Sequence, residues 1–167
     1  MPPHLQAVTV SLICRNFKLS KMELESLLLK LKDAFNSHDI KLLIECFDET
    51  YSSEQPVHPG RTFNGQEQVK KNWASNFTEM PDFSALLLRH AISNNSIWAE
   101  WEWHGTRQDN SRLFMRGVTI MGVEGGKIKW GRLYVEPVEM NGKGIEAAVE
   151  EVMHGKKNDS QKSLPKP

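Results

Sequence analysis

Apolar residues recur every three or four positions in the N-terminal part of the chain, which is the spacing of one buried helix face. This spacing predicts a first helix over residues 22–37, with Ser20 as its cap and Glu23 completing a capping box. Asp39 can cap a second, short helix, and a further stripe predicts a third helix over residues 66–77. The residues expected in the core of these helices are Leu24, Leu27, Leu28, Leu31, Phe35, Leu42, Leu43, Cys46, Phe47, Val69, Trp73 and Phe77.

From residue 84 the apolar spacing changes to every second position, which is the period of a strand with one buried face. Four strands are predicted, over residues 84–93, 97–106, 113–123 and 127–135. A short strand over residues 50–54 leads into a loop whose two prolines exclude a central strand or a helix interior. Three helices followed by an antiparallel meander indicate an α+β fold, in which the helices pack on a curved sheet and enclose a cavity.

The composition indicates one folded domain between two basic ends. The chain has 167 residues, of which 39% are hydrophobic, and this is enough for a single core. We predict an N-terminal extension over residues 1–21, the domain over residues 22–140, a short C-terminal helix over residues 141–153 and a disordered basic tail over residues 154–167. Because the formal net charge is zero and both ends are basic, the domain itself is acidic.

Charge and residue types exclude several functional classes. A net charge of zero provides no field that would recruit nucleic acid or an anionic membrane. No apolar run approaches the roughly 20 residues that span a bilayer. Cys14 and Cys46 do not form a disulfide framework, and no cysteine–histidine cluster indicates a metal site. These features favour a cytoplasmic protein that uses neither a metal nor a cofactor.

Three segments carry a resemblance to a known family. The first is Ala-Phe-Asn-Ser-His-Asp (residues 34–39) with Leu-Ile-Glu-Cys-Phe-Asp-Glu (residues 43–49); the second is Pro56 with Phe-Asn-Gly-Gln-Glu-Gln-Val (residues 63–69) and Trp73; the third covers residues 117–136. In this order and spacing they resemble the nuclear transport factor 2-like (NTF2-like) superfamily, specifically its ketosteroid-isomerase and SnoaL-like branch. The resemblance implies a cone-shaped fold with three N-terminal helices packed on a curved antiparallel sheet.

The resemblance does not extend to the residues that carry steroid isomerisation. The family's general base is an aspartate just before the loop proline, where this chain has Gln55, an amide that cannot take a proton. The family's helix tyrosine falls on Leu31, and its carboxylic acid on the sheet falls near Arg116 or Val118. Steroid-isomerase chemistry is therefore not expected, and Gln55, Arg116 and Val118 are kept as ligand-contact candidates only.

A second comparison, with SnoaL-like cyclases and limonene-type epoxide hydrolases, indicates a carboxylate near the end of the last strand. In this chain that residue is Glu136, and Arg132 and Tyr134 share its strand face by parity. An arginine or a tyrosine beside a carboxylate can tune its pKa or position a water, so the three are catalytic candidates together with His58 in the proline loop. The alternative is that Glu136 is a solvated strand end and His58 has no role in the chemistry.

The strand over residues 97–106 separates two kinds of side chain by parity. Trp101 and Trp103 lie on one face and, with Trp73, are expected to form an apolar pocket wall, or simply core. The other face carries a possible but unfavoured metal trio (Glu100, Glu102 and His104) and, by the resemblance, is the face through which a homodimer would form. Arg116, if buried, would need an acid or an anionic ligand.

Two functions remain open at this point. The first is a protein that binds a small apolar or aromatic molecule and isomerises, cyclises or hydrolyses it by cofactor-free proton transfer. The second is a binding or dimerisation module without catalysis. A cavity that contains Glu136 or Arg116 would favour the first function, and a filled interior would favour the second.

Overall fold

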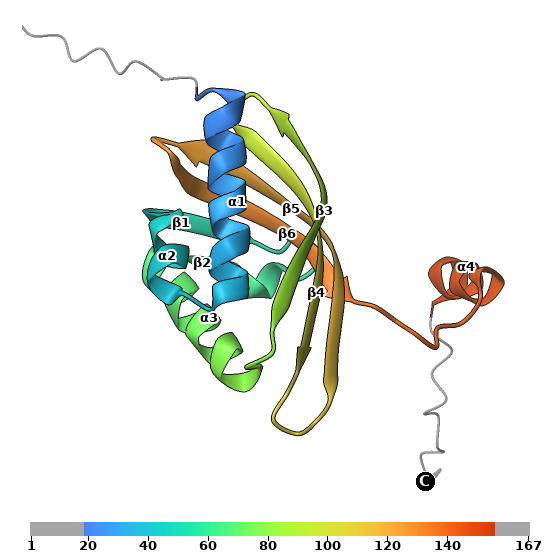
Figure 1. Ribbon diagram of the computed structural model, residues 1–167. Coiled ribbons are helices and arrows are strands. Elements are labelled where there is room, and N and C mark those ends of the chain that lie inside the picture. Colours follow the sequence, from blue (N-terminus) through green and yellow to red (C-terminus); the bar gives the residue numbers. More distant parts are fainter. Residues whose placement is uncertain (1–18, 156–167) are drawn as a thin grey trace, which may run out of the picture. The chain divides into compact units, whose positions relative to one another are not determined.

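The computed structural model describes residues 19–155. Its strands form one six-stranded sheet with the order β2-β1-β6-β5-β4-β3 (Figure 1). Its strands are β1 (Phe47–Glu54), β2 (Phe63–Asn64), β3 (Ser84–Ser93), β4 (Ser96–Thr106), β5 (Arg112–Glu124) and β6 (Lys127–Pro137). The α+β class and the antiparallel meander from β3 to β6 are confirmed. The sheet is nevertheless mixed, because β1 runs parallel to β6.

Three helices cover one face of this bent sheet: α1 (Lys21–Ser37), α2 (Ile40–Glu45) and α3 (Gln66–Glu79). The predicted capping box is confirmed, since the Ser20 side chain accepts from the Glu23 backbone N–H and the Glu23 carboxylate accepts from the Ser20 backbone N–H. Asn36 then fixes the end of α1 against β3, because its side-chain amide both donates to and accepts from the Ala85 backbone.

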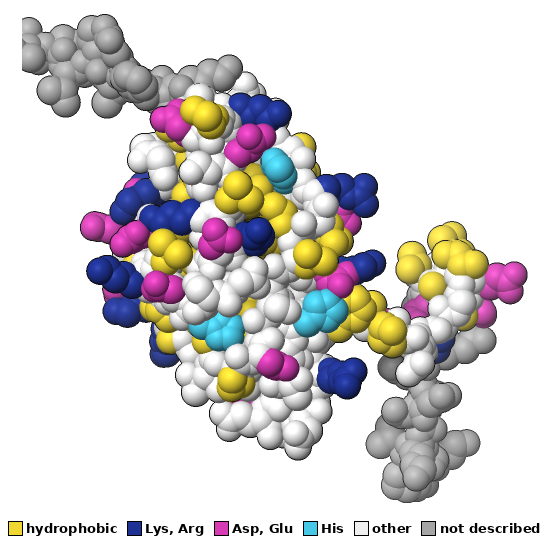
Figure 2. Space-filling view, viewed as in Figure 1, with side chains coloured by type: hydrophobic (Ala, Val, Ile, Leu, Met, Phe, Trp, Pro, Cys, Tyr) yellow, Lys and Arg dark blue, Asp and Glu magenta, His cyan; other side chains and the backbone are white. Residues whose placement is uncertain are grey.

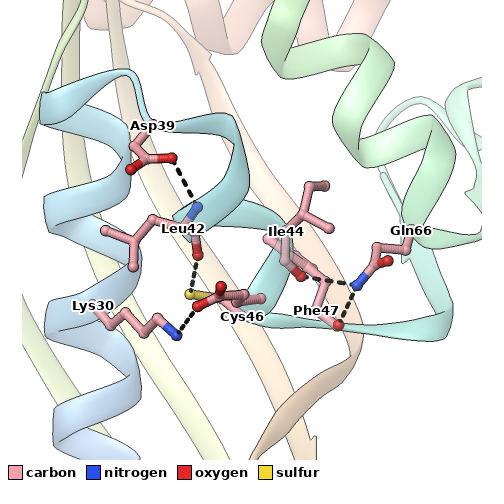
Figure 3. Close-up of polar contacts among 8 residues, drawn as sticks. Lys30, Asp39, Leu42, Ile44, Cys46, Phe47 and Gln66 are labelled. Carbon is pink, nitrogen blue, oxygen red and sulfur yellow. Dashed lines mark hydrogen bonds and ion pairs between the residues drawn. The ribbon is translucent and has the colours of Figure 1, made fainter.

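Polar contacts fix the junction of the helices with β1 (Figure 3). Asp39 caps α2 by accepting from the Leu42 backbone N–H at 2.9 Å, as predicted. The Gln66 amide at the start of α3 donates to the carbonyls of Ile44 and Phe47, so one side chain closes the end of α2 onto the beginning of β1. Cys46 is fully buried in this junction.

Alternation along the strands gives the sheet two different faces. On β4 the residues at odd positions, among them Ala99, Trp101 and Trp103, are buried against the helices, as predicted. The even positions lie on the opposite side, which we call the outer face. On this face the Glu102 carboxylate bonds to His104 at 2.6 Å and to Arg116 of β5, and both contacts lower the pKa of Glu102.

The described residues divide into two compact units between Pro137 and Val138. The second contains α4 (Ile145–His154), none of whose residues is buried. Its apolar side chains are exposed, as Figure 2 shows for this helix. The extension predicted for residues 1–21 and the tail predicted for residues 154–167 lie largely outside the described residues.

Candidate functional site

A cavity of about 410 Å³ lies between the covered face of the sheet and the helices. Aromatic and aliphatic side chains make up most of its wall: Leu31, Phe35, Phe47, Tyr51, Phe63, Val69, Trp73, Met80, Phe83, Trp101, Trp103, Leu113, Met115, Met121, Leu133 and Val135. The remaining wall residues are Gly131, the buried Ser53 and Thr119, and six partly or fully exposed polar residues that we call the polar rim: Gln55, Arg61, Asn72, Asn76, Glu79 and Arg107. The interior predicted to be hollow is therefore present, and it has an apolar body and a polar edge.

The three tryptophans that were expected at the pocket wall all lie there. Trp73 of α3 packs edge-on against Trp103 with ring centroids 5.7 Å apart, and its centroid is 4.3 Å from that of Phe35. Trp101 is almost completely buried and meets Phe35 edge-on at 5.7 Å. These contacts make the wall a set of aromatic rings packed against one another. That these tryptophans bind a ligand stays a prediction.

The face of β6 that was expected to carry the catalytic group is turned away from the cavity. Gly131, Leu133 and Val135 line the cavity, so the alternate residues Arg132, Tyr134 and Glu136 lie on the outer face. Glu136, whose position relative to the pocket the sequence left open, therefore does not line the cavity. The physical reason is the register of β6: a strand has only two faces, and the apolar residues take the covered one.

The same parity places Arg116 and Val118 of β5 outside the cavity. The positions of this strand that line the cavity are Leu113, Met115, Thr119 and Met121. The cation at Arg116 is exposed and is paired with Glu102, so it needs no buried counterion. Neither candidate ligand contact on β5 is in the cavity wall.

Gln55 and His58 lie in the loop between β1 and β2, and only Gln55 lines the cavity. The His58 Nε2 lies 3.0 Å from a carboxylate oxygen of Glu136. Four residues earlier on β6, Arg132 donates to Glu54, the last residue of β1, at 2.8 Å. Three of the four catalytic candidates thus lie where β1, this loop and β6 meet: Arg132 pairs with the end of β1, and Glu136 pairs with His58 of the loop.

Two buried indole nitrogens in the cavity wall have different surroundings. The Trp101 Nε1–H donates to the Thr119 hydroxyl at 2.9 Å, and both side chains are buried. The Trp103 Nε1 is also buried but has no hydrogen-bond partner among the described residues. The two positions share one strand face by parity, but only the Trp101 Nε1–H has a hydrogen-bond partner among the described residues.

Tyr51 is a wall residue that the sequence analysis missed. Burial raises the pKa of its phenol, and an interaction with Ser53 partly offsets that effect. Its hydroxyl reaches over β6 at Gly131, where a Cβ would lie 2.5 Å from the oxygen. Alternation from Gln55 back through Ser53 to Tyr51 carries the signal that could have found it. Arg61, by contrast, has no pattern in the sequence that relates it to the cavity.

Groups of three or more histidine, cysteine, aspartate or glutamate side chains that could hold a metal ion do not occur in the part of the chain that the structure describes. Within residues 19–155, no helix is both long and apolar enough to cross a membrane.

The bent sheet with helices over one face and a cavity between them is the ketosteroid isomerase-like, nuclear transport factor 2-like architecture. A family model of the SnoaL-like domain matches residues 29–131. The chain belongs to this SnoaL-like family.

Solved structures of similar fold include proteins of different activities. Bal32a from a soil-derived mobile gene cassette is 24% identical, with a TM-score of 0.60 over 68% of this chain and 89% of its own. IdmH, a proposed polyketide cyclase from Streptomyces antibioticus, is 17% identical, with a TM-score of 0.59 over 68% of this chain and 91% of its own. An epoxide hydrolase-like protein of M. tuberculosis is 12% identical, with a TM-score of 0.61 over 69% and 84%. None of the curated proteins matches this chain. At these identities the likeness shows the fold alone.

Proposed function

We propose that this protein binds a small apolar or aromatic molecule in its cavity. The observation that carries the proposal is a cavity of about 410 Å³ with a wall of aromatic and aliphatic side chains. Ligand pockets in proteins span about 300–1,000 Å³ and have mostly apolar walls with a few polar groups. Both features are met in this protein.

Cofactor-free proton transfer is the second candidate function, and the cavity restricts which residues could perform it. With Glu136 on the outer face, Glu79 is the only carboxylate in the wall formed by the described residues. Tyr51, whose raised pKa keeps it protonated, could donate a hydrogen bond to a developing oxyanion. The support for this candidate is that structural neighbours include an epoxide hydrolase-like protein and a proposed cyclase.

A cavity-filling variant tests the binding proposal. Leu133 lines the cavity, so Leu133→Trp replaces a small aliphatic side chain with a large indole ring that occupies part of the space. Lys71→Trp is the control, since it introduces the same ring at an exposed residue of α3 that is not part of the cavity wall. Mass spectrometry of molecules that copurify with the protein, followed by calorimetry with the molecule found, should show binding to the wild type and the control and at least a tenfold loss in Leu133→Trp. Equal binding by all three proteins would refute the proposal.

We also propose that two copies associate through the outer face. Large apolar side chains are exposed there, including Trp98 at 47% and Tyr134 at 38% of their full areas. Exposed apolar surface of this kind is typical of protein interfaces. A cytoplasmic location and independence of a cofactor stay predictions from the sequence.

A further inference from the structure

We propose that the ligand carries an anionic group, such as a carboxylate, which Arg61 binds at the polar rim while an apolar body fills the cavity. The inference rests on the proposed function, because it names the class of molecule that the same cavity would take. It follows from the charges of the wall, the geometry of the loop that carries Arg61 and the apolar character of the interior.

The first argument is a census of charge. Arg61, Glu79 and Arg107 are the charged residues of the wall formed by the described residues. Arg107 donates to Ser111 at 3.1 Å and stands close enough to Asp109 to help lower the pKa of that carboxyl. Arg61 forms no ion pair with any residue that the structure describes. The wall therefore has an excess positive charge, and Arg61 is the cation without an acidic neighbour.

The second argument is the set of hydrogen-bond donors that Arg61 leaves unused. A guanidinium presents five N–H donors in a planar fork that matches a carboxylate. One of these donors reaches the Gln55 side-chain oxygen, at a long 3.5 Å. Since Gln55 accepts through that oxygen, its own NH₂ group is left to donate to the same ligand. Two donor groups of the rim can thus serve one anion.

The third argument is that the loop fixes the backbone at Arg61 before any ligand binds. The His58 N–H donates to the Gln55 carbonyl at 2.7 Å, and the Arg61 N–H donates to the His58 carbonyl at 2.9 Å. Pro59 begins the short 3₁₀ turn that ends at Arg61, and its ring fixes one backbone dihedral. The contact of His58 with Glu136 ties this turn to β6.

Glu79 acts in the opposite direction. It also lines the cavity, and its carboxylate accepts from the Gln108 backbone N–H at 3.4 Å. The negative charge of the Glu79 carboxylate would repel the anionic group of a ligand that came close to it. The anion is therefore expected at Arg61 and away from the end of α3, which gives the bound ligand a fixed direction.

A matched pair of probes tests the inference. Naphthalene-2-acetic acid and naphthalene-2-acetamide have almost the same shape and differ in charge at neutral pH. Calorimetric titrations would compare their dissociation constants in the wild type, in Arg61→Gln, in Arg61→Lys and in the control Lys71→Gln. The control makes the same change in net charge at an exposed residue of α3 that is not part of the cavity wall.

The expected result is that the wild type binds the acid about tenfold more tightly than the amide, which is the worth of one charge-assisted contact. Arg61→Gln should bind both equally, Arg61→Lys should recover part of the preference, and Lys71→Gln should keep it. If the wild type binds both probes equally, or if Arg61→Gln retains the preference, the inference is wrong and the proposed function stands. If neither probe binds the wild type, both proposals fail.

Discussion

The contribution of the Trp101–Thr119 hydrogen bond to stability can be measured with Trp103 as the reference, because the Trp103 Nε1 has no partner among the described residues. Trp101 and Trp103 lie two residues apart on the same face of β4, both are buried, and both line the cavity. Substitution of either by Phe removes the same indole atoms from a buried position. Only Trp101→Phe also removes a hydrogen bond, because only its Nε1–H has a partner among the described residues.

The size of the effect follows from what remains after the substitution. In Trp101→Phe the Thr119 hydroxyl stays buried, at 7% exposure, without its donor. A buried polar group that loses its partner costs about 1–3 kcal/mol. Because the loss of ring volume is common to both variants, Trp101→Phe should be less stable than Trp103→Phe by about 1–2 kcal/mol.

Urea denaturation followed by far-UV circular dichroism measures these stabilities without relying on the tryptophan signal that the variants change. A double-mutant cycle with Thr119→Val isolates the pair, and its coupling energy should be about 1 kcal/mol. Equal stability losses for the two Phe variants, together with a coupling below about 0.3 kcal/mol, would refute the reasoning.

Three further predictions concern acid stability, thiol reactivity and assembly. Contacts with Lys129 and Thr50 lower the pKa of Asp48 to about 2, so the stability they contribute is complete above the ordinary pKa near 4 and is lost as the pH falls toward 2. Asp48→Asn should therefore flatten acid denaturation curves in this range, and an unchanged curve would contradict the assignment. Burial raises the pKa of Cys46 to about 11, so in a Cys14→Ser background the native protein should react with a disulfide reagent at pH 8 far more slowly than the unfolded protein; comparable rates would disagree. Trp98→Glu on the outer face should lower the dimer fraction in sedimentation equilibrium. A wild type that is monomeric at every concentration would refute the proposed dimer.

Much of the fold could be predicted from the sequence because its signals are local. The capping box at Ser20 and Glu23, the cap at Asp39 and the alternation of β4 each act over a few residues, and the structure has all of them. The direction of β1 could not be predicted. Its sequence pattern indicates a strand but contains nothing about a partner that is distant in the chain, and its pairing with β6 depends on how the whole sheet closes.

The candidate site was predicted in part. Which residues were placed correctly depends on the alternation of side chains between the two faces of a strand. Placement of Trp101 and Trp103 in the wall follows from burial of the larger apolar set. For Glu136 the sequence gives correct parity with Arg132 and Tyr134, but parity alone does not say which face is covered. The alternate residues Leu133 and Val135 are apolar and line the cavity, so a comparison of the two sets of residues would have indicated the covered face. The position of Arg61 depends on a loop conformation that has no periodic signal.

The parallel pairing of β1 with β6 has a consequence for the order in which the chain can fold. The Lys129 ammonium donates to the Asp48 carboxylate across 81 positions of sequence, so this edge of the sheet forms only after most of the domain has been synthesised. Contacts this distant in the chain slow folding, because the intervening segment must lose its freedom first. During translation β1 therefore cannot form its parallel pairing until β6 has been synthesised. A nascent chain that ends before β6 lacks one wall of the cavity.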